Sequence, residues 1–409
     1  MARELLSQYP LSEARFNFKR RYTKVKIAYV GDFIGHGKSL PTNGTSLTLL
    51  LSKINSVDQI DVYCPTKTED IKEYFLPSNI RIIESYQYND PRSIFGIFSL
   101  RKGNYNRVIF NILPTSFGTS SLSNFLGLIS PIILRKFFGM RNLEIIFHNS
   151  VFTNDFKKLG YGSLYDKMRA SILRRVERLI FRNINTFVLL TLYKKRIDTY
   201  VKNNLVSTLD ERHVAGVTTA FLNNENNLEF IYSNPAPNNP TILLHGSWGP
   251  QKNLELGLSV LQNLREEGYK FKVILSGSVN HHFPIYGEKF LKTLERYKAV
   301  VDHYWGYVDE KDVFKLFTEA DLLLLPYNTP GGISEVMYIA MFFDLPTVAV
   351  DFPEYREQTR GAANIKLVSE EEFYSAVKNF MPLIGHKRKI LIKNKISEAM
   401  ENIKNLLKN

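Results

Sequence analysis

Short apolar runs rich in β-branched and aromatic residues alternate along the chain with longer segments of helical character. In the first half these runs predict strands at 26–30, 59–63, 107–111, 144–147 and 186–190. In the second half TILLHGS, FKVILSGS, DHYWGYV, ADLLLLPY and LPTVAVD each predict a buried strand ending in Gly, Ser, Pro or Asp. Strands that alternate with helices form parallel sheets covered by helices, so the pattern predicts an α/β fold.

An Asn- and Pro-rich stretch, NNENNLEFIYSNPAPNNP, interrupts the alternation between the two halves. A chain of 409 residues is long enough for two domains of ordinary size. We therefore expect one Rossmann-like, doubly wound domain over 1–220, a linker over 221–240, a second such domain over 241–384, and a basic C-terminal helix over 385–409. Ligands of doubly wound sheets bind at the carboxyl ends of the strands, where candidate chemistry is expected.

The loop after the first predicted strand contains Gly37-Lys38-Ser39, which resembles the end of a phosphate-binding P-loop. A P-loop needs a further glycine five residues before Gly37, and that position is Asp32. Pro41 also falls where the P-loop helix would need backbone N–H donors. The spacing argues against a P-loop, and the helix is expected to start at Thr45 or Ser46, after a long loop.

The chain has 53 Lys and Arg against 40 Asp and Glu, a net charge of +13. This balance favours an anionic partner such as a phosphorylated ligand, a nucleic acid or a membrane surface. A single cysteine, Cys64, excludes an internal disulfide and fits a reducing compartment. The N-terminus lacks the apolar core of a secretory signal, and the apolar run 125–134 is far shorter than a membrane span. These features predict a cytoplasmic protein that is soluble or peripheral on the inner face of the membrane.

Four segments of the second half carry a family resemblance: HGSWGPQKNLELGLSVLQNL, VILSGS, YWGYVDEKDVFKLFTEADLLLLPY and PGGISEVMYIAMFFDLPTVAVD. In this order and spacing they resemble the donor domain of family 4 glycosyltransferases of the GT-B fold. The resemblance covers about residues 240 to 360, and in the first half it rests on the glycine loop and on IIFHNS. It implies two Rossmann-like domains that face each other across a cleft, the first binding the acceptor and the second a nucleotide-sugar. It also implies sugar transfer with retention, no cofactor, and a C-terminal helix that returns to the first domain.

The resemblance places Lys252 where the family has a lysine that contacts the donor diphosphate, although a solvated lysine at a helix start is the plainer interpretation. Ser247 stands where the family usually has an arginine, so phosphate stabilisation depends on Lys252 and backbone amides. Glycines that open a helix let the backbone approach a phosphate at the positive end of the helix dipole, although a simple turn before a core helix has the same composition. The implied donor-binding residues are Gly44, Gly246, Ser247, Lys252, Gly277, Tyr307, Val308, Gly331, Gly332, Ile333, Ser334 and Glu335.

One departure from the family concerns a pair of glutamates eight positions apart, the second of which holds the ribose hydroxyls. Aligned on IAMFFDLPTVA, these positions are Gly331 and Ile339. The nearest acid, Glu335, lies one helical turn before Ile339. It either contacts the ligand from that earlier turn or only stabilises the helix N-terminus. Both interpretations stay open, and Glu335 joins His148 and Lys252 as a candidate catalytic residue.

His148-Asn149 follows the apolar run EIIF, so both side chains are expected at a strand tip facing the cleft. The resemblance places His148 close to the transferred sugar. A histidine there either exchanges a proton or binds a sugar hydroxyl. Asp-x-Asp is absent from the sequence and His281-His282 lacks a third ligand, so no metal is expected.

The segment MRASILRRVERLIFRN places basic residues at helical spacing and suggests contact with an anionic bilayer. FLGLISPIILRKFFGMR combines apolar residues with Arg135, Lys136 and Arg141. A lipid-linked or glycan acceptor would account for both segments, whereas a solvated helix with its apolar stripe in the core is the alternative. The residues predicted to contact the membrane are Arg174, Arg175, Arg178 and Arg182.

Three rival functions follow from the same sequence. A catalytically silent GT-B scaffold that binds a membrane or a partner would explain the missing glutamates. A nucleic-acid-binding protein would use the same positive charge, but no zinc spacing or RNP-like motif is present. A sugar phosphorylase would need a pyridoxal phosphate lysine, for which the sequence has no indication. The prediction is a glycosyltransferase with a nucleotide-sugar donor.

Overall fold

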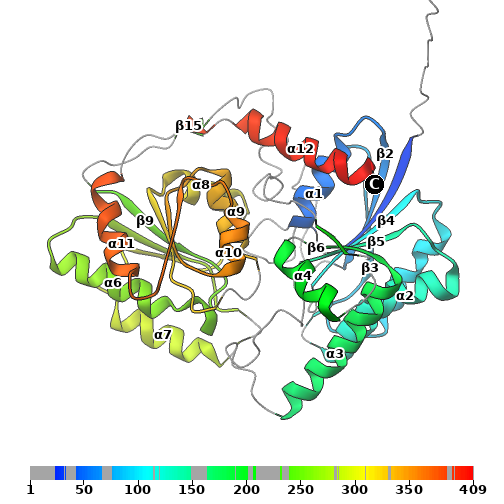
Figure 1. The fold of residues 1–409 in the computed structure, drawn as a ribbon, viewed down its shortest axis with the longest axis horizontal. Coiled ribbons are helices and arrows are strands. Elements are labelled where there is room, and N and C mark those ends of the chain that lie inside the picture. The colour runs from blue at the N-terminus through cyan, green and yellow to red at the C-terminus, as the bar shows by residue number, and fades with distance from the viewer. Residues whose placement is uncertain are drawn as a thin grey trace, which may run out of the picture.

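The protein contains two parallel sheets with helices packed around each, side by side in Figure 1. Each sheet and its helices form one domain, and the chain passes through the N-terminal domain before the C-terminal one. The computed structural model describes residues 24–31, 33, 43–66, 76–113, 116–118, 120–148, 164–188, 190–200, 206–208, 231–232, 239–280, 283, 285–308, 310–329, 333–384, 389–390 and 392–408.

The N-terminal sheet has the strand order β3-β2-β1-β4-β5-β6-β7, with every pairing parallel. Its strands are β1 (Val25–Gly31), β2 (Val57–Pro65), β3 (Ile80–Tyr86), β4 (Arg107–Ile112), β5 (Leu143–Phe147), β6 (Asn185–Val188) and β7 (Val206–Thr208). Its helices are α1 (Asn43–Ser52), η2 (Ser93–Lys102), α2 (Ser121–Phe138), α3 (Leu164–Asn183) and α4 (Thr191–Tyr200). The order in which strands are added to the sheet reverses between β1 and β4, and this switch point is the position where doubly wound sheets bind ligands.

The C-terminal sheet has the order β11-β10-β9-β12-β13-β14 and is also parallel. Its strands are β9 (Thr241–His245), β10 (Lys272–Ser276), β11 (His303–Trp305), β12 (Leu322–Leu325), β13 (Thr347–Val350) and β14 (Ile365–Val368). Its helical segments are η3 (Pro250–Lys252), α6 (Leu254–Glu266), α7 (Tyr286–Arg296), α8 (Glu310–Glu319), α9 (Glu335–Phe342), α10 (Pro353–Gln358), α11 (Phe373–Phe380) and η4 (Met381–Leu383). The corresponding switch point lies between β9 and β12.

The predicted α/β class and the two doubly wound sheets are confirmed. Every strand predicted from an apolar run is present, within a few residues of its predicted bounds. Within the two large sheets, the apolar runs missed β3, β7 and β14, which lie at sheet edges.

The start of α1 corrects one expectation. The helix begins at Asn43, two residues before the predicted Thr45, so Gly44 lies in its first turn and not in the preceding loop. The Gly44 carbonyl oxygen accepts a hydrogen bond from the buried Thr48 hydroxyl at 2.8 Å. A hydroxyl that donates to the carbonyl four residues earlier is a contact made within a helix, so Gly44 belongs to the helix.

Two short strands pair the segment that precedes the C-terminal sheet in the sequence with the segment that follows it. β8 (Ile231–Tyr232), within the expected linker, pairs antiparallel with β15 (Lys389–Ile390). The last helix, α12 (Ile392–Lys408), follows β15 and lies against α1 of the N-terminal domain (Figure 1). Its buried residues Ile396, Ala399 and Ile403 belong to an apolar cluster that contains residues of both domains.

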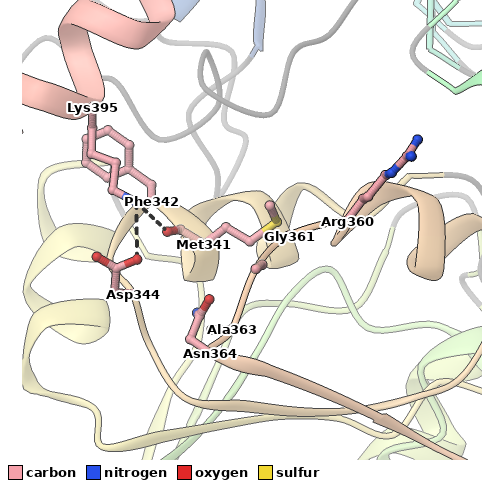
Figure 2. A pocket seen from close by; sticks show the side chains of 9 residues that line it. Met341, Phe342, Asp344, Arg360, Gly361, Ala363, Asn364 and Lys395 are labelled. Carbon is pink, nitrogen blue, oxygen red and sulfur yellow. Dashed lines mark hydrogen bonds and ion pairs between the residues drawn. The ribbon is translucent and has the colours of Figure 1, made fainter.

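The first turn of α12 is also attached to the C-terminal domain. Figure 2 shows Lys395 reaching toward the end of α9, where its ammonium group donates to the Met341 carbonyl at 3.4 Å and to the Asp344 carboxylate at 3.1 Å. These groups line a pocket beside the loop that precedes β14. The pocket therefore lies at the amino ends of the strands, away from the edge where doubly wound sheets bind ligands.

The domains also meet through α10 and α4. The Glu357 carboxylate accepts hydrogen bonds from the backbone N–H groups of Thr191 and Leu192, the latter at 2.8 Å. Arg196 on α4 donates to the buried Glu354 carboxylate at 3.0 Å. A carboxylate at a helix N-terminus satisfies free N–H groups and the helix dipole, so Glu357 caps a helix of the other domain.

Two glycines hold the carboxyl ends of neighbouring strands close together. Gly277, after β10, has φ +99°, and a Cβ there would lie 1.8 Å from the Gly246 carbonyl oxygen. The Gly277 N–H donates to the carbonyls of Trp305 and Gly306 at 3.0 and 2.8 Å. Only glycine fits this position, and it brings the ends of β9, β10 and β11 together.

We predict that the double substitution Glu354→Gln and Glu357→Gln opens the two domains. Each carboxylate contributes about 1 kcal/mol at this contact, and the amides that replace them carry no charge for the helix N-terminus or for Arg196. Small-angle X-ray scattering should report a larger radius of gyration than for the wild type. Glu295→Gln, which removes an exposed ion pair with Lys298, is the matched control and should leave the radius unchanged. An unchanged radius in the double variant would refute this domain contact.

We also predict that Gly277→Ala destabilises the C-terminal domain far more than Gly268→Ala. Gly268 has a similar φ of +91° but no atom within 4 Å of an added Cβ, so Gly268→Ala measures the cost of backbone strain without a steric clash. That strain costs about 1–2 kcal/mol, and overpacking against Gly246 should add about 2 kcal/mol or more. Differential scanning calorimetry of both variants measures the difference. Equal losses would contradict the close approach of the two strand ends.

Candidate functional site

Lys252 lies at the end of η3, beside the carboxyl end of β9. Its ammonium group lies 3.7 Å from the centroid of the Tyr327 ring, which follows β12. A Cβ added to Gly246 would lie 3.9 Å from the Lys252 Cε atom and 3.8 Å from the Tyr327 hydroxyl. The three residues therefore surround one point at the β9–β12 switch.

The environment of Lys252 disfavours its charged form. Burial lowers the pKa of the Lys252 ammonium to about 7, although the negative charge of Glu335 opposes this shift. The face of the Tyr327 ring carries partial negative charge and attracts the cation, but it is not a full counter-ion. A phosphate bound here would supply the missing negative charge and raise the lysine pKa again.

His245 is the last residue of β9 and directly precedes Gly246. Its Nδ1 atom is 2.7 Å from the Ser276 hydroxyl oxygen at the end of β10, and the side chain is buried. Among the described residues, its Nε2 atom has no hydrogen-bond partner. Burial, followed by the charge of Lys252, lowers the pKa of His245 to about 3, so the imidazole is neutral at physiological pH.

The N-terminus of α9 faces the same region. Ser334 is the N-cap residue, and its hydroxyl accepts a hydrogen bond from the Met337 N–H at 3.3 Å. The buried Gln358 side chain of α10 bonds both backbone groups of Ser334: it accepts from the N–H at 3.0 Å and donates to the carbonyl at 2.6 Å. Glu335 follows in the first turn and is half-buried. Gly331 and Gly332 lie outside the described residues.

Other residues from the sequence prediction differ in exposure. Ser247 is half-buried, Tyr307 is 47% exposed and Val308 is buried. Ile333 packs against the apolar cluster of the N-terminal domain as well as against its own, so the segment before α9 contacts both domains. Ile339 is buried and apolar, and α9 therefore offers no carboxylate at that position.

In the N-terminal domain, His148 follows β5 and is buried. Its Nε2 atom makes a short hydrogen bond with the Asn111 side-chain oxygen, and the Asn111 amide donates to the Tyr29 hydroxyl at 2.8 Å. The three side chains extend from adjacent strands β5, β4 and β1, across the second switch point. Asn149 lies outside the described residues.

The structure thus brings Gly246, Lys252, Gly277 and the Ser334–Glu335 turn to one edge of the C-terminal sheet. The sequence prediction missed His245, Tyr327 and Gln358. His245 and Tyr327 end the runs TILLH and LLLLPY, so their positions at strand ends were a usable signal. Gln358 had no such signal, because its partner Ser334 is 24 residues away.

This arrangement suits a doubly charged or larger anion. One cation, the backbone at two glycine-held strand ends and a capped helix N-terminus point at the same space, and hydrogen-bond donors of this kind stabilise developing negative charge. Within the described residues, no group of three His, Cys, Asp or Glu side chains could hold a metal ion, and no helix is both long and apolar enough to cross a membrane. His281 and His282 lie outside the described residues.

Residues 239–382, which form most of the C-terminal domain, match the family model described as Glycosyl transferases group 1. No curated protein sequence is significantly similar to the chain. Several solved structures share the fold over nearly its whole length.

Sucrose-phosphate synthase from Thermosynechococcus elongatus has a TM-score of 0.62 and 14% identity, covering 94% of this chain and 95% of that chain. HepE from Anabaena, in complex with UDP-glucose, has a TM-score of 0.59 and 12% identity, covering 94% and 99%. WaaG, a glycosyltransferase involved in lipopolysaccharide biosynthesis, has a TM-score of 0.54 and 13% identity, covering 94% and 95%. The C-terminal segment thus matches the group 1 glycosyltransferase family, and the chain as a whole shares the GT-B fold of these solved structures.

Proposed function

We propose that the chain transfers a sugar from a nucleotide-sugar donor to an acceptor held by the N-terminal domain. The observation that carries this proposal is the Lys252 ammonium, half-buried between Gly246, Tyr327 and Glu335. A half-buried cation whose charge the Tyr327 ring and Glu335 only partly offset favours an anion, and a donor diphosphate is such an anion. The shared fold with HepE, solved in complex with UDP-glucose, supports a nucleotide-sugar as the ligand class.

In the proposed reaction, the bond between the sugar and the diphosphate breaks, and a bond from the same sugar carbon to the acceptor oxygen forms. The acceptor hydroxyl loses its proton, which the leaving diphosphate accepts. Negative charge grows on the diphosphate, where Lys252 and the N-terminus of α9 stabilise it. Retention, with the acceptor entering on the face that the diphosphate leaves, fits this proton path.

Two further residues receive proposed roles. His148 is held by Asn111 at the tip of β5 and positions a sugar hydroxyl from the N-terminal side. Glu335 has two open roles: it orients a donor hydroxyl, or it stabilises the protonated form of Lys252. The buried Ile339 leaves the usual ribose contact unfilled, so Glu335 is the acid of α9 nearest to that task.

The same departure favours a second candidate function. A chain with Gly331 and Ile339 in place of the paired glutamates would bind a nucleotide diphosphate without turnover, as a catalytically silent scaffold. Donor consumption separates the two candidates, whereas diphosphate binding alone does not.

The acceptor we propose is a lipid-linked or glycan molecule at an anionic membrane surface. The net charge of +13 and the basic helix α3 support this part of the proposal. Arg174, Arg175 and Arg182 are exposed and available to lipid headgroups. Arg178 is half-buried and its Nε atom is enclosed, so we assign the membrane role to the other three.

We predict that one of UDP, GDP and ADP stabilises the protein against heat and that Lys252→Met removes the effect. A ligand at about 100 times its dissociation constant adds about 2.7 kcal/mol of stability. Lys289→Met, an exposed lysine of the same domain, is the matched control and should respond like the wild type. Thermal unfolding with each diphosphate in excess gives the result.

The outcomes separate the candidates. If one diphosphate stabilises the protein and the matching nucleotide-sugar is consumed, the transferase proposal stands. Stabilisation without consumption by the wild type, even with membrane extract as acceptor source, favours the silent scaffold. No stabilisation by any diphosphate, or equal stabilisation of Lys252→Met, contradicts the proposed donor site.

A further inference from the structure

An aromatic and basic surface lies where η2 meets the end of α2, on the side of the N-terminal domain that faces away from the C-terminal domain (Figure 1). Three of its aromatic side chains are well exposed: Phe95 by 60%, Phe137 by 79% and Phe138 by 39%. Exposed apolar groups that cluster in this way mark interaction sites. We call this region the η2–α2 surface, and it consists of Phe95, Phe98, Phe137, Phe138, Arg101, Lys102, Lys136 and Arg141.

The geometry of η2 explains why these residues share one face. A 3₁₀-helix has three residues per turn, so Phe95, Phe98 and Arg101 follow one another along a single line. Ile94, Ile97 and Leu100 form the adjacent line and are buried against the domain. Because Ile94, Ile97 and Leu100 are buried against the domain, the line of Phe95, Phe98 and Arg101 faces outward.

The end of α2 completes the cluster. The Phe98 ring centroid lies 5.9 Å from that of Phe95 and 5.8 Å from that of Phe138. The Arg101 guanidinium lies 5.0 Å from the centroid of the Phe138 ring. Gly139, in the left-handed conformation with φ 68°, ends α2 directly after the aromatic pair and leaves Phe137 projecting beside it.

The charge around these rings is of one sign. Residues 91–143 contain no Asp or Glu and seven Lys or Arg, four of which belong to the η2–α2 surface. Arg101, Lys102, Lys136 and Arg141 are all exposed. Aromatic rings flanked by cations match the headgroup region of an anionic bilayer, where rings enter the apolar boundary and cations meet phosphates.

We propose that the η2–α2 surface docks the protein on an anionic lipid bilayer. A second copy of the chain fits this surface poorly, because a two-fold interface would place its four cations against the same four cations. The proposal extends the proposed function by naming the membrane contact of the N-terminal domain. Binding to lipid needs no donor and no turnover, so its test is independent of the transferase proposal.

The experiment is co-sedimentation of the full chain with vesicles of phosphatidylcholine alone and of phosphatidylcholine mixed with phosphatidylglycerol. The wild type should bind the mixed vesicles, and binding should weaken as salt is added. Phe95→Ser with Phe137→Ser should lower the partition coefficient at least about tenfold. Replacing the four cations by glutamine should reduce binding to the level seen with phosphatidylcholine alone.

Two matched variants act as controls. Ile285→Ser with Leu291→Ser removes two apolar groups that are also well exposed, by 92% and 65%, from the C-terminal domain and should leave binding unchanged. Arg174, Arg175 and Arg182 changed to glutamine test the additional membrane contact proposed for α3, and this variant should lose less binding than the variant in which the four cations of the η2–α2 surface are replaced. Because all substituted residues are exposed, thermal unfolding of every variant should match that of the wild type.

Several results would overturn the proposal. Equal binding to both vesicle types, or none to either, removes the anionic bilayer as the partner. Loss of binding with the α3 variant but not with the η2–α2 variants moves the contact to α3. A dimer in sedimentation velocity that becomes monomeric in Phe95→Ser with Phe137→Ser assigns the surface to a second copy of the chain.

Discussion

The partly buried charge of Lys252 is the constraint on which the candidate site depends. A lysine whose pKa burial lowers to about 7 is costly to keep protonated, and the surrounding groups only partly offset that cost. Tyr327 contributes its ring face and Glu335 a carboxylate, while His245 stays neutral because burial and Lys252 both disfavour its charge. The site is thus arranged to hold one positive charge and to be completed by an anion. A donor diphosphate meets this requirement better than a monovalent ion, because the α9 N-terminus lies beside the same space.

The contacts of α10 connect this site to the other domain. Gln358 fixes both backbone groups of Ser334, and the neighbouring Glu357 caps α4 across the domain boundary. Ile333, one residue before the cap of α9, packs against the N-terminal apolar cluster. Movement of the domains therefore acts on the helix N-terminus at the proposed donor site. On the other side, α12 contacts α1 and reaches the end of α9 through Lys395, so α9 is tied to the N-terminal domain from both ends.

Burial explains which parts of the fold the sequence could predict. Central strands of a parallel sheet are covered on both faces, so they read as continuous apolar runs, as LLLL of β12 does. The missed strands β3, β7 and β14 are edge strands, and the sequence IRIIESY of β3 is buried only at its first and last residues, with the polar residues Arg81, Glu84 and Ser85 between them. Lys252 and Gly246 were predicted from the family resemblance of the segment that follows the run TILLH, and they lie at a strand end, where doubly wound sheets bind ligands. The roles of Gln358 and Glu357 depend on partners 24 and 166 residues away, which no local pattern encodes.

The most direct test of the account is proton uptake when UDP binds, measured by titration calorimetry near pH 8 in two buffers of different ionisation enthalpy. At that pH a lysine of pKa about 7 is mostly neutral, and a bound diphosphate raises its pKa, so binding should take up close to one proton. The uptake should vanish near pH 6, where Lys252 is already charged, and it should be absent in Lys252→Met. Binding of UDP with no proton uptake at pH 8, or with the same uptake in Lys252→Met, would contradict the claim that Lys252 holds the diphosphate.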